Sequence, residues 1–238
     1  MAPAVIGITT SINDEGDRQG VPTNYAEAVV AGGGIPILLP MISEAAVAGA
    51  AFTALCSLFD GLIIVGGGVI SKNMVGGQPA DLDDTPALRD TTDAAFLKHA
   101  MTAGKPVLGI CYGMQFINAE LGGSITADWQ EYNGGGDEYR HSPKRGVSEH
   151  PLSAVSAGSI IEKALHTGGV VEAAGAVVNS FHLQVIGKTM LADGLTLTAE
   201  TADGAVEAYE GLGGQLHGVQ WHPEKMIAEV RYHRMALR

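Results

Sequence analysis

The stretch "KPVLGICYGMQFINAELGG" (residues 105–123) passes from a short apolar run into a helical pattern, with one cysteine at the junction. Gly109 and Gly113 stand two residues before and two residues after Cys111. Such glycines allow a sharp strand-to-helix turn that exposes a nucleophile above a sheet. The cysteine would also lie at a helix N-terminus, where the helix dipole favours a thiolate. The pattern predicts a reactive thiol at Cys111, although a buried structural cysteine in a tight turn would look the same.

The sequence around this junction alternates short apolar runs with helical patterns as far as Gly123. That alternation is typical of a parallel sheet covered on both faces. After Gly123 the apolar runs become shorter and less regular, which indicates an antiparallel extension. We therefore expect an α/β fold, a flavodoxin-like three-layer sandwich with a mainly parallel central sheet and a smaller antiparallel extension in the C-terminal half. No linker separates the halves, so residues 1–238 are predicted to form a single domain.

The individual elements can be placed by their turn and capping residues. Strands are expected at 4–9, 35–40, 61–68 and 106–111, and helices at 43–59, 85–104 and 113–123. Later strands are expected at 176–182, 195–201, 205–211 and 216–222.

Composition excludes several classes of protein. The 238 residues are 46% apolar, and no apolar run reaches the length of about 18–20 residues that spans a bilayer. The N-terminus lacks the basic region of a signal peptide, so we expect a cytoplasmic location. Lys and Arg total 14 against 26 Asp and Glu, and the net charge of −12 disfavours binding to nucleic acid or to an anionic membrane. The two cysteines lack CxxC spacing, and Cys56 is interpreted as a small core residue.

A thiol nucleophile needs a base, and "GVQWHPE" (218–224) contains one. His222 and Glu224 are two residues apart at a predicted strand end, so their side chains should project to the same side. Glu224 would then accept from one imidazole nitrogen while the other faces Cys111. They could instead be exposed polar residues. A zinc site with His217 is less favoured because no third ligand is evident. We predict no metal and no cofactor.

A thiol that attacks a carbonyl group would also need donors for the oxyanion that forms. The N–H of Tyr112 is one candidate because it follows the cysteine at the helix start. The glycine loop "VGGG" (65–68) follows a predicted strand, and its glycines would allow the N–H of Gly67 to turn inward. An ordinary glycine turn is the alternative.

Together, "VGGG", "GICYGMQ", "NSFH" and "GVQWHPE" resemble, in this order, the class I glutamine amidotransferase-like superfamily. The segments "NYAEAVVAGGGIPILLP", "DGLIIVGGG" and "VNSFHLQ" resemble the γ-glutamyl-γ-aminobutyrate hydrolase (peptidase C26) branch most closely. The resemblance covers nearly the whole chain. Val65 and Val69 depart from the branch pattern around the glycine loop, and Tyr112 stands where an arginine is common.

The resemblance implies roles for individual residues. Cys111 matches the nucleophile, His222 the general base and Glu224 the residue that orients it. Gly67 and Tyr112 match the oxyanion-hole amides. The positions that match those holding the glutamyl head group are Gln115, Ser180, Phe181 and His182.

These roles imply hydrolysis of a small-molecule γ-glutamyl amide through a γ-glutamyl thioester, releasing glutamate and an amine. The sequence "CYGMQ" also occurs in glutaminase domains. The alternative function is therefore a glutaminase subunit that supplies ammonia to a separate synthetase. A non-catalytic binding module is a third reading, disfavoured by the intact Cys–His–Glu set. The sequence leaves open whether the chain forms a homo-oligomer.

Two polar segments remain. Residues 128–151 could form a lid over the substrate or a surface loop. Their candidate contacts to the amine side of a substrate are Tyr132, Tyr139, Arg140 and His141. The acidic run 81–90 is interpreted as a solvated helix entrance in preference to an attractor for a cationic amine.

Overall fold

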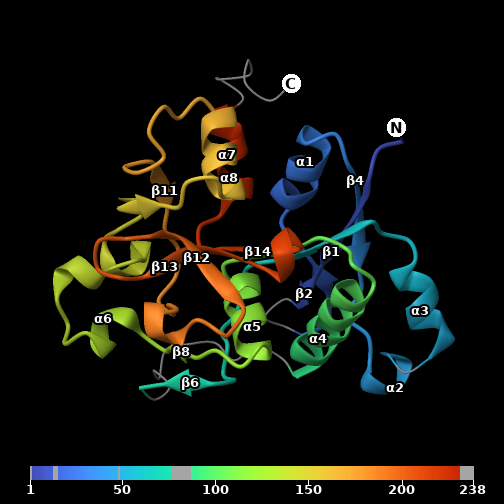
Figure 1. The fold of residues 1–238 in the computed structure, drawn as a ribbon. Coiled ribbons are helices and arrows are strands. Elements are labelled where there is room, and N and C mark those ends of the chain that lie inside the picture. The colour runs from blue at the N-terminus through green and yellow to red at the C-terminus, as the bar shows by residue number, and fades with distance from the viewer. Residues whose placement is uncertain (1, 13–15, 48, 77–86, 231–238) are drawn as a thin grey trace.

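A computed structural model of the protein describes residues 2–12, 16–47, 49–76 and 87–230 (Figure 1). Among these residues, a central sheet has eight strands in the order β10-β12-β13-β14-β7-β5-β1-β4. The parallel strands are β1 (Val5–Thr9), β4 (Ile35–Leu39), β5 (Gly61–Ile64), β7 (Val107–Ile110) and β14 (Leu216–Val219). The antiparallel strands are β10 (Ala154–Val155), β12 (Leu195–Glu200) and β13 (Val206–Gly211).

Helices cover both faces of this sheet, as Figure 1 shows. One face carries α2 (Glu44–Val47), α3 (Ala50–Cys56), α4 (Ala87–Thr102) and α5 (Tyr112–Glu120), and the other carries α1 (Thr23–Ala31), α7 (Ile160–Thr167) and α8 (Pro223–Val230). Phe96 and Ile117 belong to the first core, while Tyr25 and Ile161 belong to the second. The apolar runs of β5, β7 and β14 are mostly buried between these layers, whereas the edge strand β4 exposes Ile35 and Leu38. The predicted α/β sandwich with an antiparallel extension is confirmed.

Short elements complete the described fold. Three two-stranded pairs join β2 (Ser11–Ile12) to β3 (Gln19–Gly20), β6 (Met74–Val75) to β8 (Ile125–Thr126), and β9 (Glu149–Pro151) to β11 (Val177–Asn179). The short helix α6 is Trp129–Tyr132. No helix in the described part of the chain is long and apolar enough to cross a membrane.

The structure corrects several element boundaries: the strand expected over 176–182 is β11 (Val177–Asn179), that expected over 216–222 is β14 (Leu216–Val219), and two more differ nearer the N-terminus. The single helix expected over 43–59 is two helices, α2 and α3, and Gly49 begins the second one in an extended conformation. Glycine is a poor helix former, so a break there costs little. The strand expected over 61–68 ends at Ile64, and the glycines after it form a loop.

Candidate active site

Cys111 occupies the sharp turn between β7 and α5. Its backbone has φ 51° and ψ −106°, and residues other than glycine rarely adopt such a positive φ. The flanking glycines permit the close packing of the turn. A β-carbon on Gly113 would clash with the carbonyl oxygen of Ile64, and one on Gly109 would lie 2.6 Å from the carbonyl carbon of Gly113. The turn therefore holds the thiol at the carboxyl end of the parallel strands, where α/β proteins bind ligands.

His222 and Glu224 meet directly. Nδ1 of His222 lies 2.7 Å from Oε1 of Glu224, and both side chains are buried. Their placement differs from the predicted strand end, because β14 ends at Val219 and Glu224 lies in the first turn of α8. Asn179 fixes the backbone of His222. Its side chain donates to the carbonyl of His222 and accepts from the N–H of His222, each at 2.8 Å. The helix start, and not a strand, therefore turns the carboxylate toward the imidazole.

The thiol and the imidazole both border Gly66. A β-carbon on Gly66 would lie 2.6 Å from Cε1 of His222 and 3.4 Å from Cβ of Cys111. Burial lowers the pKa of His222, but hydrogen bonds with Cys111 and Glu224 and their negative charge outweigh it and raise this pKa to about 9. Because Nδ1 is engaged by Glu224, Nε2 is the nitrogen left for the thiol. The structure thus brings together the three residues Cys111, His222 and Glu224.

Tyr25, a residue that the sequence analysis missed, supports this arrangement from α1. Its hydroxyl accepts a hydrogen bond of 2.9 Å from the N–H of Gly66. Burial, followed by the charge on Glu224, holds the pKa of Tyr25 well above its usual range. The hydroxyl therefore stays protonated beside Glu224. An aromatic residue in an amphipathic helix carries no local signal of such a role.

Arg89 lies beneath the glycine loop and was also missed. Its guanidinium, 2% exposed, donates to the carbonyl oxygens of Val65 at 2.7 Å and Gly66 at 3.3 Å, and to that of Gly67. The described peptide bonds are trans, so each following N–H points the opposite way. The N–H groups of Gly67 and Gly68 are thus directed away from Arg89, and both residues line the pocket beside Cys111. This orientation suits an oxyanion donor.

The buried charge of Arg89 has a partner on its own helix. Oδ2 of Asp93 lies 3.3 Å from Nε of Arg89, and both side chains are buried. The guanidinium also stacks on the ring of Tyr112, with its central carbon 3.7 Å from the ring centroid. The hydroxyl of Tyr112 donates to Asp90 at 2.7 Å. Tyr112 therefore faces the arginine-bearing helix α4, while its N–H lies in the first turn of α5.

A pocket of about 290 Å³ opens over Cys111 and His222. Three of the four predicted substrate-binding residues line it, namely Gln115, Phe181 and His182. Ser180 is fully buried instead, and its hydroxyl donates to the carbonyl of His141 at 2.6 Å. Two lysines that the sequence analysis did not single out, Lys144 and Lys225, also line the pocket.

The segment 128–151 contacts the pocket through different residues from those proposed. Ser142 and Lys144 line the pocket, whereas Tyr132 and Tyr139 pack against Trp129 and Arg140 pairs with Asp137. His141 is buried with His150, His182 and Glu207 in a group that could hold a metal ion. His217 instead contacts the carbonyl of Gly214. Within the acidic run 81–90, residues 81–86 lie outside the described residues.

Comparison with known proteins identifies the family of the chain. The family model described as Peptidase C26 matches residues 4–224. Protein NtpR of Enterococcus hirae is 33% identical over 211 residues, covering 85% of this chain and 80% of that protein. The γ-glutamyl-γ-aminobutyrate hydrolase PuuD of Escherichia coli K12 is 28% identical over 223 residues, covering 91% and 83%.

The fold is also found in a solved structure of low sequence identity. A glutamine amidotransferase from Thermotoga maritima superposes with a TM-score of 0.58 at 11% identity, over 99% of this chain and 87% of that one. The range of the family match, residues 4–224, includes the glycine loop, the cysteine turn and the His222–Glu224 pair. The chain is thus a glutamine amidotransferase-like hydrolase and belongs to the Peptidase C26 family.

Proposed function

We propose that the protein hydrolyses the γ-glutamyl amide bond of a small γ-glutamyl compound, using Cys111 as the nucleophile. The observation that carries the proposal is the convergence of the Cys111 turn and the His222–Glu224 pair on Gly66 at one end of the pocket. A nucleophile, a base and a group that orients the base are the minimum set for acyl transfer to a thiol.

The reaction follows from the positions of these groups. His222 takes the thiol proton, and the sulfur of Cys111 attacks the γ-carbonyl carbon. The resulting oxyanion is stabilised by the N–H groups of Gly67 and Tyr112. The imidazolium then donates its proton to the leaving amine, and a γ-glutamyl thioester remains on the sulfur. Water, deprotonated by His222, hydrolyses the thioester to glutamate and frees the thiol.

The pocket also favours a class of substrate. Lys144 and Lys225 place two ammonium groups along a pocket beside Phe181, whose ring lies 4.0 Å from Nζ of Lys225. Two cations attract substrates that carry carboxylates at both ends. A γ-glutamyl group joined to an amino acid has this character, as does γ-glutamyl-γ-aminobutyrate, after which the E. coli relative is named. We infer an acidic leaving amine over a cationic one.

A panel of γ-glutamyl amides tests both statements. The wild-type chain alone should release glutamate fastest from γ-glutamyl-γ-aminobutyrate, more slowly from glutamine and slowest from γ-glutamylputrescine. Lys225→Ala should raise KM for the acidic substrate more than for glutamine. Release that is unchanged in Cys111→Ala would refute the proposed nucleophile. Activity on glutamine alone, and only with an added synthetase, would instead favour the glutaminase subunit.

A further inference from the structure

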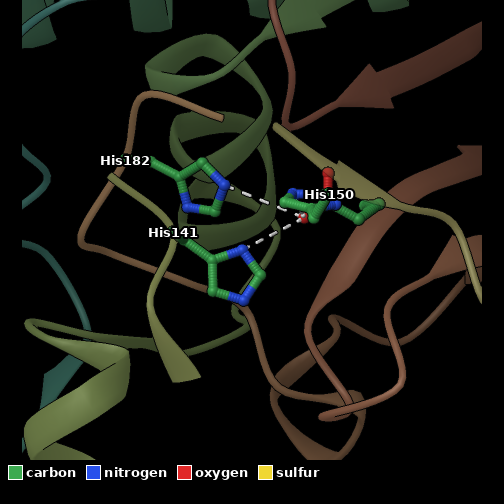
Figure 2. A group of neighbouring side chains, drawn as sticks. His141, His150 and His182 are labelled. Carbon is green, nitrogen blue, oxygen red and sulfur yellow. Dashed lines mark ion pairs between the residues drawn. The ribbon is translucent and has the colours of Figure 1, made fainter. Parts of the chain in front are cut away.

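Beside the pocket lies a second group of titratable side chains, which we call the histidine cluster: His141, His150, His182 and Glu207. One potential ligand atom from each residue lies within 4.8 Å of the other three. Figure 2 shows His141 and His182 directed toward a carboxylate oxygen, that of Glu207, beside His150, with the three histidines on separate segments. His141 follows a 3₁₀ turn, His150 is on β9, His182 is in the loop after β11 and Glu207 is on β13.

Glu207 is the unusual member of the cluster. Its side chain is fully buried, and neither carboxylate oxygen accepts a well-aligned hydrogen bond from the residues that the structure describes. The imidazole nitrogens nearest to Oε1 are Nε2 of His150 at 3.3 Å, and Nδ1 of His141 and Nε2 of His182 at 3.8 Å each. Two of these separations are too long for hydrogen bonds. A buried carboxylate whose nearest nitrogens lie at or beyond hydrogen-bond length is costly, and a cation bound among these residues would compensate its charge.

The spacing suits a tetrahedral zinc ion. Zinc bonds to imidazole nitrogen and carboxylate oxygen are about 2.0–2.2 Å long, so neighbouring ligand atoms in a tetrahedron lie about 3.4 Å apart. The three nitrogen–oxygen separations of 3.3–3.8 Å lie near that value, and all four ligand atoms are within 4.8 Å of one another, so a small inward movement of the side chains would complete the tetrahedron. Three neutral imidazoles and one carboxylate are also a donor set that zinc accepts, and four protein ligands close its coordination sphere.

Outer hydrogen bonds orient two of the imidazoles toward the centre. Nε2 of His141 lies 2.9 Å from Oδ2 of Asp203, which leaves Nδ1 facing Glu207. Nδ1 of His182 lies 3.1 Å from the carbonyl of Gln184, which leaves Nε2 facing inward with only a 3.4 Å contact to Ser180. Metal-binding histidines characteristically engage their second nitrogen with a carboxylate or a backbone carbonyl in this way.

We propose that the histidine cluster binds one zinc ion as a closed structural site. The ion would join segment 128–151 and the loop 180–184 to the central sheet, and so hold one wall of the pocket. No metal site was predicted from the sequence, because the four ligands come from separate segments and show no spacing motif. The proposal is independent of the reaction at Cys111.

Metal analysis of the full chain is the first test. Protein stripped with dipicolinate and titrated with Zn²⁺ should bind one ion per chain, with Mg²⁺ unable to compete. His150→Ala and Glu207→Gln should each weaken zinc binding at least about 100-fold, and Asp203→Asn about 10–100-fold. The matched control His166→Ala removes an exposed histidine on α7 and should bind zinc as the wild type does. Failure of the wild type to bind zinc would overturn the proposal.

Thermal unfolding distinguishes a metal site from a purely ionic cluster. Zinc should raise the Tm of the wild type by at least about 5 °C and leave that of Glu207→Gln unchanged. In the presence of chelator, the Tm difference between the two proteins should shrink or reverse, since the variant no longer buries an unpaired carboxylate. A difference that is the same with and without zinc would show that Glu207 only pairs with histidines, and would overturn the proposal. Co²⁺ should give the visible absorption of a tetrahedral site in the wild type alone.

Discussion

The Cys111 corner and the histidine cluster are neighbouring sites, and each contains a buried carboxylate. The two sites differ in how closely imidazole nitrogens approach that carboxylate. Phe181 packs against His222, with ring centroids 5.8 Å apart, while the next residue, His182, belongs to the cluster. In the corner, Glu224 contacts an imidazole nitrogen at 2.7 Å, a hydrogen bond that would stabilise charge on the imidazole in the proposed reaction. In the cluster, the imidazole nitrogens lie 3.3 Å or more from Oε1 of Glu207. Direct contact suits an acid–base pair, whereas a gap between donors suits a cation.

The largest effect should come from the thiol. Cys111→Ala removes the nucleophile, so turnover of the preferred γ-glutamyl amide should fall by at least about 10⁴-fold. Zinc content and the rise in Tm on zinc binding should stay those of the wild type, because the substitution lies outside the histidine cluster. Steady-state kinetics and metal analysis of the same preparation check both.

Cys56 offers the matched control for this prediction. It is buried on α3, and burial raises its pKa to about 11. A glutamine-like electrophile at neutral pH should therefore label Cys111 in the wild type and in Cys56→Ala. Mass spectrometry that found the label on Cys56, or retained in Cys111→Ala, would contradict the assignment.

Paired substitutions of the two carboxylates come next. Glu224→Gln should lower kcat by about 10²–10⁴-fold, because a neutral amide no longer stabilises the imidazolium of His222. It should keep the zinc dependence of the Tm. Glu207→Gln should abolish that zinc dependence. If both variants lost the same property, the two sites would not be functionally distinct.

A smaller effect is expected from substitution of Asn179, whose side chain bonds to the backbone of His222 and not to its imidazole. Asn179→Ala should lower kcat by about 10–100-fold with little change in KM, since the imidazole loses its position but the pocket keeps its lining. Asn179→Asp still accepts from the N–H of His222 and should recover part of the rate. An unchanged kcat in the alanine variant would show that α8 alone positions the imidazole.

The smallest effect is a pH dependence of stability. The pKa of His222 is about 9 in the folded protein, above the value of about 6.5 expected in the unfolded chain. The stabilising contribution of the imidazolium is therefore complete below pH 6.5 and is lost as the pH rises through 9. Urea unfolding from pH 6 to 10 should show a shallower decline for Cys111→Ala, in which one partner of His222 is gone. Parallel pH curves for the two proteins would contradict this coupling.

Much of the corner could be predicted from the sequence alone. Gly109, Cys111 and Gly113 act through local backbone geometry, since a strand-to-helix turn this tight needs small residues at fixed offsets. His222 and Glu224 are also near neighbours in the chain. Apolar runs alternating with helical patterns were likewise enough to predict the α/β sandwich, because burial on both faces leaves a direct mark on composition.

Only the tertiary structure revealed the remaining features. These are the contacts of Tyr25, Arg89 and Asn179 and the assembly of the histidine cluster. Arg89 lies on a polar helix that looks solvated in sequence, yet it reaches three carbonyls of a loop more than twenty residues away. The four residues of the cluster come from separate segments, so no spacing in the chain marks them. The sequence by itself determined the local turn and the order of the elements. Long-range packing decided which polar side chains share one buried volume, because contacts across many residues depend on how the sheet brings its strands together.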